Sequence, residues 1–99
     1  MPSDENLREF FYANGMLRTQ LPYHEGKLDG TVVLYWPNGH MKRRCTFRRG
    51  VRTGLDQMWN ARGQLVDEGH YREGRAVDVH RRWDDQGQLI EEWEWGKDH

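Results

Sequence analysis

Histidine, cysteine and carboxylate side chains are the groups in this chain that could hold a metal ion or move a proton. One cysteine, Cys45, and five histidines are present, and they lack the spacing of a metal site. The histidines are His24, His40, His70, His80 and His99. The glycines lie in turn-like stretches and not in the clusters that cradle phosphate groups. We therefore expect neither a metal site nor a cofactor.

Carboxylates are abundant, but their spacing does not indicate a catalytic pair. Asp67 and Glu68 recur 24 positions later as Glu91 and Glu92, which places them in a repeated structural unit. General acid–base catalysis needs carboxyl groups in a pocket that perturbs their protonation, and no residue cluster of this sequence marks such a pocket. We expect a protein that is not an enzyme.

A 24-residue repeat organises the chain. Its most regular column is glycine, at Gly15, Gly39, Gly63 and Gly87, each inside a hairpin-like stretch such as YWPNGH. Three further columns keep this spacing: the rings Phe11, Tyr35, Trp59 and Trp83, the aliphatic residues Leu17, Met41, Leu65 and Leu89, and the rings Tyr23, Phe47, Tyr71 and Trp95. Such repetition is typical of hairpins stacked into one continuous structure.

The turn residues predict how each repeat folds. A three-residue loop, in which a left-handed glycine closes a type I turn, suits all four copies, whereas a type I′ loop suits Asn38-Gly39 but not Arg62-Gly63. This loop pairs Tyr35 with Met41, and likewise the ring and the aliphatic residue of every other repeat. Continued along the strands, it buries the odd-numbered face and gives the pairs Glu9–Thr19, Val33–Arg43, Gln57–Asp67 and Arg81–Glu91.

We expect an all-β fold, an antiparallel β-meander of about four hairpin repeats in a single twisted sheet. The eight predicted strands span residues 6–12, 16–24, 30–36, 40–49, 54–60, 64–73, 77–83 and 88–95. The predicted single domain is residues 6–96, after a flexible N-terminal tail at 1–5. Its repeats span about 6–29, 30–53, 54–77 and 78–96.

The stretches FYANGMLRTQLPYHEGKLDG and LYWPNGHMKRRCTFRRGVRTG resemble the bacterial variant of the MORN repeat. That pattern is an aromatic pair, Asn-Gly, an aliphatic residue, a further aromatic and then Gly-Lys-x-x-Gly. The resemblance runs from about Phe10 to Trp95, and Arg62, Gln86 and Asp78 depart from the Asn and Gly positions. Many proteins with this variant resemble the YwqK-like antitoxin group. The resemblance therefore implies a protein that binds and neutralises a partner protein.

The even-numbered face is the predicted partner site. A face covered by water should be polar, yet in repeats one and two this face carries large apolar side chains. Aromatic side chains with arginine beside them are favoured at interface hot spots. The predicted partner-binding residues are Phe10, Tyr12, Arg18, Val32, Leu34, Trp36, Arg44 and Met58. In the competing interpretation the N-terminal tail, or curling of the sheet, covers these side chains.

Charge is unevenly spread along a chain whose formal net charge is −1. A basic run contains Lys42, Arg43, Arg44, Arg48, Arg49 and Arg52, and the C-terminal stretch carries Asp84, Asp85, Glu91, Glu92, Glu94 and Asp98. Because phosphate binding needs a basic footprint over the whole domain, we expect no nucleic-acid partner. The main alternative to a partner-binding protein is a homo-oligomeric scaffold in which repeat two of one copy meets repeat four of another. A lipid- or nucleic-acid-binding surface is the third.

Cysteine usage and hydropathy indicate the compartment. The single Cys45 excludes an internal disulfide and fits a reducing environment. The chain contains no apolar run of the length that spans a membrane, and its first ten residues lack the regions of a signal peptide. We expect a cytoplasmic protein.

Overall fold

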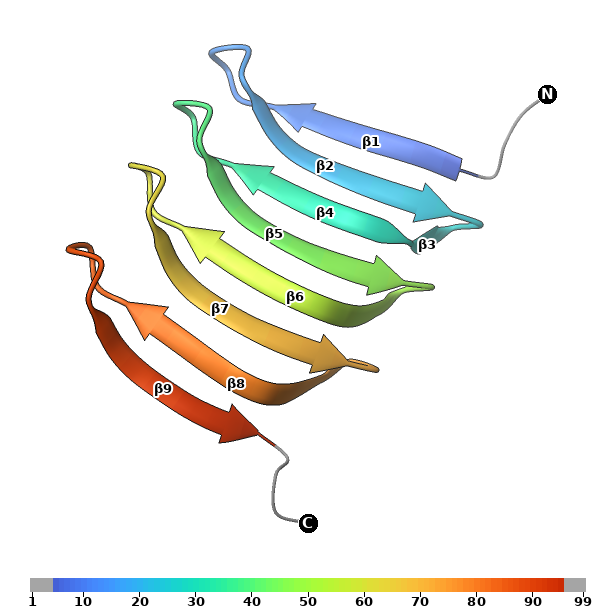
Figure 1. Cartoon of the computed structure of the whole chain (residues 1–99). Helices are drawn as coiled ribbons and strands as arrows, with labels where there is room; N and C mark the ends of the chain where they lie inside the picture. The colour runs from blue at the N-terminus through green and yellow to red at the C-terminus, as the bar shows by residue number, and fades with distance from the viewer. Residues whose placement is uncertain (1–4, 96–99) are drawn as a thin grey trace.

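The computed structural model describes residues 5–95, which form one antiparallel sheet without a second layer (Figure 1). Its strands are β1 (Glu5–Phe11), β2 (Leu17–His24), β3 (Lys27–Leu28), β4 (Gly30–Tyr35), β5 (Met41–Arg48), β6 (Val51–Trp59), β7 (Leu65–Arg72), β8 (Arg75–Trp83) and β9 (Leu89–Trp95). They lie in chain order, with the two-residue β3 paired to β2 beside the main path. The predicted all-β meander is confirmed. Residues 1–4, which hold most of the predicted tail, and residues 96–99 lie outside the described residues.

Each hairpin tip is a three-residue loop closed by a left-handed glycine, as predicted. In repeat two the N–H of Gly39 donates to the carbonyl of Trp36 at 2.9 Å, and the N–H of Trp36 donates to the carbonyl of His40 at 2.8 Å. The same two bonds recur in the other three tips. At Gly39 φ is 95°, and the equivalent glycines have φ between 83° and 88°, where a β-carbon causes strain.

At the other end of the strands, the turns are shorter than the gaps between the predicted strands. The two-residue turns Glu25-Gly26, Arg49-Gly50 and Glu73-Gly74 join neighbouring strands there. Both residues of each turn have positive φ, for example 51° at Arg49 and 83° at Gly50. This is the type I′ geometry, whose twist matches that of the strands it joins. The strands therefore continue right up to these turns.

A one-residue bulge beside every hairpin tip shifts the strand register by one residue from the predicted register. Tyr35 pairs with Met41, and the equivalent pairs form in the other repeats, as predicted. The next pair is Leu34 with Arg43, because Lys42 is an extra residue on β5. The predicted partners of Glu9, Val33, Gln57 and Arg81 are therefore wrong by one residue. The observed pairs are Glu9–Gln20, Val33–Arg44, Gln57–Glu68 and Arg81–Glu92.

The bulge also separates the two columns of rings onto opposite faces, since one extra residue reverses the alternation of side chains. The Cys45 face, as we call it, carries the rings Tyr23, Phe47, Tyr71 and Trp95 beside the buried Val32 and Cys45. The Tyr35 face carries Phe11, Tyr35, Trp59 and Trp83 with their aliphatic partners. The prediction that the odd-numbered residues form one buried face is therefore wrong.

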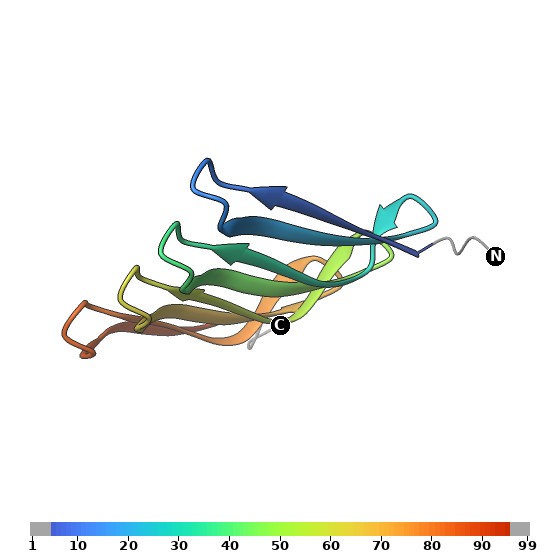
Figure 2. The same cartoon turned by 90° about the horizontal axis from the view of Figure 1, so that it is seen from above.

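A second irregularity bends the strands near the middle of the sheet. On β6, Gly54 has a φ of 77°, and three residues, 54–56, lie opposite Cys45 alone. The equivalent positions in repeats two and four hold Gly30, with φ of 121°, and Asp78, with φ of 60°. Bulges of this kind curve a sheet, and the curvature is visible in Figure 2. Aspartate can replace the glycine because it enters the left-handed region more readily than most residues.

Side chains at the tips link each repeat to the next one. The Nδ2 of Asn14 donates to the carbonyl of Pro37 at 3.1 Å, and the Nδ2 of Asn38 donates to the carbonyl of Ala61 at 2.8 Å. Arg62 continues the series by donating from Nη2 to the carbonyl of Asp85 at 3.0 Å. The sheet is thin, at 47 × 38 × 14 Å, so contacts between neighbouring repeats replace those with a second layer.

Repeats three and four keep the same turn without the turn asparagine. In repeat two the Oδ1 of Asn38 accepts the N–H of His40 at 3.0 Å. In repeat three Asn60, two positions before Arg62, accepts the N–H groups of residues 62 and 64 at 3.0 and 3.1 Å. Asp84 does the same in repeat four, at 2.9 Å to each of residues 86 and 88. The departures at Arg62 and Gln86 are thereby compensated.

The substitution Gly54→Ala should lower the free energy of unfolding by about 1 kcal/mol. A β-carbon at Gly54 meets no atom within 4 Å, so the loss comes from the left-handed backbone alone. Urea unfolding followed by circular dichroism measures it. The matched reverse change, Asp78→Gly, should raise stability by about 0.5 kcal/mol. A Gly54→Ala variant as stable as the wild type would contradict the strained bulge.

Candidate functional site

An apolar stripe crosses the Tyr35 face from β1 to β9, beside the hairpin tips. It consists of the four ring–aliphatic pairs Phe11–Leu17, Tyr35–Met41, Trp59–Leu65 and Trp83–Leu89. Because the described sheet has no second layer, these side chains stay partly exposed, up to 56% at Phe11. A continuous apolar stripe that other elements leave uncovered is typical of a protein-binding surface.

The stripe is hollowed where repeats two and three meet. A cavity of about 340 Å³ is lined by His40, Met41, Arg44, Trp59 and Gly63. The ring of His40 lies against Gly63, where a β-carbon would be 3.5 Å from its Nδ1 atom. The thioether of Met41 and the ring of Trp59 give the cavity apolar walls, and Arg44 adds a positive charge. The cavity can therefore hold an apolar side chain beside an anionic group.

Arg44 is exposed and forms no ion pair among the described residues. It belongs to a row across the Tyr35 face whose members are Gln20, Val33, Arg44, Gln57 and Glu68. Its immediate neighbours are neutral, and Glu68 already accepts a hydrogen bond from Gln57 at 2.8 Å. By contrast, Arg81 pairs with Glu92 at 2.6 Å. The charge of Arg44 is therefore available to a group from outside the sheet.

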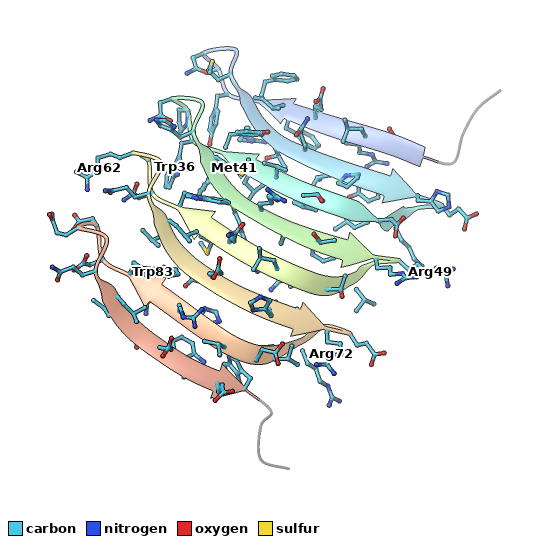
Figure 3. All side chains as sticks on the ribbon, viewed as in Figure 1. Trp36, Met41, Arg49, Arg62, Arg72 and Trp83 are labelled. Atoms are coloured by element: carbon cyan, nitrogen blue, oxygen red, sulfur yellow. The ribbon has the colours of Figure 1, made fainter. Side chains whose placement is uncertain are left out.

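A second cavity, of about 700 Å³, opens at the edge formed by the two-residue turns. Its lining is charged and consists of His24, Glu25, Lys27, Asp29, Arg48 and Arg49. One carboxylate is engaged, because the Oδ1 of Asp29 accepts the backbone N–H of Arg49 at 2.9 Å. In Figure 3, Arg49 and Arg72 lie at this turn edge, at the opposite end of the strands from Arg62. In the lining of this cavity, Lys27, Arg48 and Arg49 thus lie with two carboxylates, Glu25 and Asp29.

A buried carboxylate pairs with two arginines of the Cys45 face. Asp56, which is 7% exposed, accepts hydrogen bonds from Nε and Nη2 of Arg43 at 3.1 and 2.7 Å. Arg52 approaches the same carboxylate at 3.6 Å, and its guanidinium lies over the rings of Phe47 and Tyr71. The hydrogen bonds to Asp56 raise the pKa of Arg43 above its ordinary value. These contacts hold repeats two and three together.

His80 is the histidine with the most extensive contacts on the Cys45 face. Its Nε2 atom lies 2.9 Å from Oδ1 of Asp67, and its ring stacks on Trp93 with centroids 4.5 Å apart. Within residues 5–95 no three His, Cys, Asp or Glu side chains are grouped so that they could hold a metal ion. That part of the chain also contains no helix long and apolar enough to cross a membrane.

The predicted partner-binding residues do not form one surface. Phe10, Val32, Leu34 and Met58 lie on the Cys45 face, and Val32 is only 7% exposed. The guanidinium of Arg18, the extra residue of the first bulge, lies 5.9 Å from the centre of the Phe10 ring. Arg44 lies on the opposite face. The bulges therefore separate side chains that simple alternation had grouped together.

Tyr12 and Trp36, the other two predicted anchors, bond to the following repeat. The Oη of Tyr12 donates to the carbonyl of Tyr35 at 2.5 Å, and the Nε1 of Trp36 donates to the carbonyl of Trp59 at 3.0 Å. The ring of Trp36 also carries Lys42, whose Nζ lies 4.7 Å from the ring centre. Both side chains therefore have a structural role at the tips.

Met41 and Trp59 lie on the odd-numbered face that the sequence predicts to be buried, so the sequence does not identify them as surface residues. The signal that could have found them is the predicted fold itself. A single sheet has no second layer, so an apolar column stays accessible on either face.

Residues 4–25 and 28–49 each match the MORN repeat variant. The two matched segments follow one another directly and correspond to the hairpins β1–β2 and β4–β5. The later repeats, where Arg62, Asp78 and Gln86 replace the turn residues, lie outside the matched segments.

Among solved structures, the chain resembles the crystal structure of accessory secretory protein 1,2 and 3 in Streptococcus pneumoniae. The TM-score is 0.50 at 13% sequence identity, and the match covers 98% of this chain and 18% of that chain. The chain thus spans less than a fifth of that protein's length, and the likeness concerns the fold alone. No curated protein matches the chain.

Replacing Trp36 by phenylalanine should lower the free energy of unfolding by about 1 kcal/mol, because the carbonyl of Trp59 loses its donor. Trp83→Phe is the matched control, since the indole N–H of Trp83 makes no hydrogen bond in the described structure. Thermal and urea unfolding of the two variants measure the difference. Equal losses would show that the ring, and not the hydrogen bond, links repeats two and three.

Cys45 should react slowly with a thiol reagent in the folded protein and rapidly in urea. Burial is the main cause that raises the pKa of its thiol, and the charge of Asp56 raises it further. A raised pKa in the folded state favours the neutral thiol. The neutral buried thiol therefore contributes to the free energy of unfolding. That contribution is complete below the ordinary thiol pKa and is lost as the pH rises through the raised value. Absorbance with an aromatic disulfide, recorded against pH, follows the reaction, and equal rates with and without urea would contradict this burial.

Proposed function

We propose that the chain is a non-catalytic protein–protein interaction module that binds one partner protein on the Tyr35 face. The observation that carries this proposal is the cavity in the apolar stripe, where Met41 and Trp59 lie beside the unpaired Arg44. Aromatic side chains with an arginine at a central hollow are typical of interface hot spots. The size of the sheet, 47 × 38 Å, leaves room for the roughly 800 Å² that each partner buries in a standard interface.

The Tyr35 face supports this proposal better than the face predicted from the sequence. On the Cys45 face, Val32 is buried and Arg43 is bound to Asp56, so both have their contacts within the sheet. On the Tyr35 face, the stripe is only partly covered, and Arg44 forms no ion pair among the described residues. Binding there needs no rearrangement of the sheet, which lowers the cost of association.

We further propose that the partner is a toxin or effector-like protein in the cytoplasm, which binding neutralises. The support is the resemblance of the MORN repeat variant to the YwqK-like antitoxin group. A broad surface that docks as a single unit suits this role, because it can occlude the active site of a partner. A cytoplasmic location agrees with the unpaired Cys45.

A homo-oligomeric scaffold is the second candidate, and the open edges of the sheet favour it. In the described residues β1 and β9 each have a neighbour on one side only, and they expose Leu7 at 56% and Ile90 at 54%. Unpaired edges can pair with another copy. Light scattering over a range of concentrations separates the two functions, since a partner-binding module keeps the mass of a single chain.

The substitution Met41→Asp should weaken capture of the partner about 30-fold or more, because it places a charge in the apolar cavity. Leu7→Asp is the matched control: it makes the same kind of change on the Tyr35 face, at an exposed residue outside the cavity. Affinity chromatography from the native host, with circular dichroism to confirm folding, compares the variants. Equal capture by wild type and Met41→Asp would reject the Tyr35 face as the site.

Neutralisation is tested with the captured protein itself. The partner expressed alone should stop growth, and co-expression of the wild-type chain should restore it, whereas the Met41→Asp variant should not. A captured partner that leaves growth unchanged would reject the antitoxin role and leave the binding function in place.

A further inference from the structure

The charged side chains of β5 continue the cavity toward the turn edge. On the Tyr35 face this strand presents Met41, Arg44, Thr46 and Arg48 in succession. Arg44 and Arg48 lie four residues apart, so about 13 Å of extended chain separates them. Because Lys42 is the extra residue of the bulge, Met41 and Arg44 lie opposite Tyr35 and Val33, only two residues apart on β4. We call the surface from Met41 to Arg48 the β5 track.

Small side chains line the middle of the β5 track, so the surface there is lower than at the two arginines. Thr31, Thr46 and Thr53 lie side by side on β4, β5 and β6, between the two arginines. Their hydroxyl groups can donate and accept hydrogen bonds, and they do not rise above the neighbouring arginines. An extended segment of another protein can therefore lie along β5 without meeting a bulky side chain between its two ends.

The charges near the β5 track are unbalanced. Residues 25–52 contain seven Lys and Arg residues against two carboxylates, Glu25 and Asp29, whereas residues 78–95 contain two against six Asp and Glu residues. Three of the seven are engaged on the Cys45 face or at a tip: Arg43 and Arg52 with Asp56, and Lys42 with Trp36. The other four, Lys27, Arg44, Arg48 and Arg49, form neither an ion pair nor a cation–π contact in the described structure.

We infer that the β5 track binds an extended acidic segment of the partner protein. An apolar side chain of that segment occupies the cavity between Met41 and Trp59, and two carboxylates meet Arg44 and Arg48. Side chains on one face of an extended chain alternate with a period of two, so the carboxylates lie at the second and sixth positions from the apolar residue. This inference rests on the proposed function and adds the chemistry of the partner.

A protein segment fits this surface better than a nucleic acid does. The cavity beside Arg44 has apolar walls, and a phosphate backbone has no side chain to fill it. Residues 78–95, on the same sheet, carry six Asp and Glu residues against two Lys and Arg residues and would repel a long polyanion. A short acidic segment reaches the four cations without extending over that region.

A variant with one reversed charge, assayed for capture of the partner, tests the inference. Arg44→Glu should weaken binding of the partner about tenfold or more, because a charge-assisted hydrogen bond becomes a repulsion. Arg75→Glu is the matched control, since Arg75 is exposed on the Tyr35 face at the start of β8, outside the track. Full capture by Arg44→Glu, together with lost capture by Met41→Asp, would overturn the acidic segment while the proposed function stands. An equal loss in Arg75→Glu would also overturn it, because the charge effect would then not be local.

A synthetic probe tests the same chemistry without the partner. The probe is a blocked peptide with a leucine and with glutamates at the second and sixth positions after it, followed by fluorescence anisotropy. Glutamine in place of both glutamates, or serine in place of leucine, should each weaken binding about tenfold. Equal binding of all three peptides would overturn the inference, as would tighter binding of a single-stranded oligonucleotide of the same length.

Discussion

A sheet of one layer cannot bury its apolar side chains against another layer, so every repeat of this protein depends on the repeats beside it. The backbone ladder supplies the first link between them. The tips supply a second, because Asn14, Asn38 and Arg62 each bond to a carbonyl in the next repeat. Asp56 supplies a third within the face that carries Cys45. Stability is therefore shared between nearest neighbours, as in other repeat proteins.

The bulge beside each tip gives the two faces of the sheet different sets of side chains. It sends the rings of Tyr23, Phe47 and Tyr71 to the side of Cys45, where Arg52 lies against two of them. The rings near the tips go to the other side, where they stay partly exposed. The Cys45 face thus carries the Asp56 contacts that join repeats two and three, whereas the Tyr35 face leaves Arg44 without an ion pair among the described residues. A single extra residue in each repeat produces both outcomes.

The repeat itself, the type of every tip and the pairing of Tyr35 with Met41 could be predicted from the sequence, because turn chemistry is local and recurs four times. The next pair along, Leu34 with Arg43, could not. A bulge present in every repeat preserves the spacing of 24, so no irregularity of spacing reveals it. The same bulge explains why the sequence did not predict the candidate site. Side-chain alternation continued past the bulge places Arg44 on the predicted partner face, but it places Met41 and Trp59 on the predicted buried face.

The turns of repeats three and four have a consequence for how the chain can diverge. Asn60 and Asp84 hold their loops from the first position, so the side chains of Arg62 and Gln86 no longer bear on the conformation of the turn. In repeats one and two, Asn14 and Asn38 must serve both the turn and the bond to the next repeat. Turn and link are therefore separate at the third tip, where Asn60 holds the loop and Arg62 makes the bond to the next repeat. A single substitution at Arg62 or Gln86 leaves the loop held, whereas one at Asn14 or Asn38 removes both kinds of bond at once.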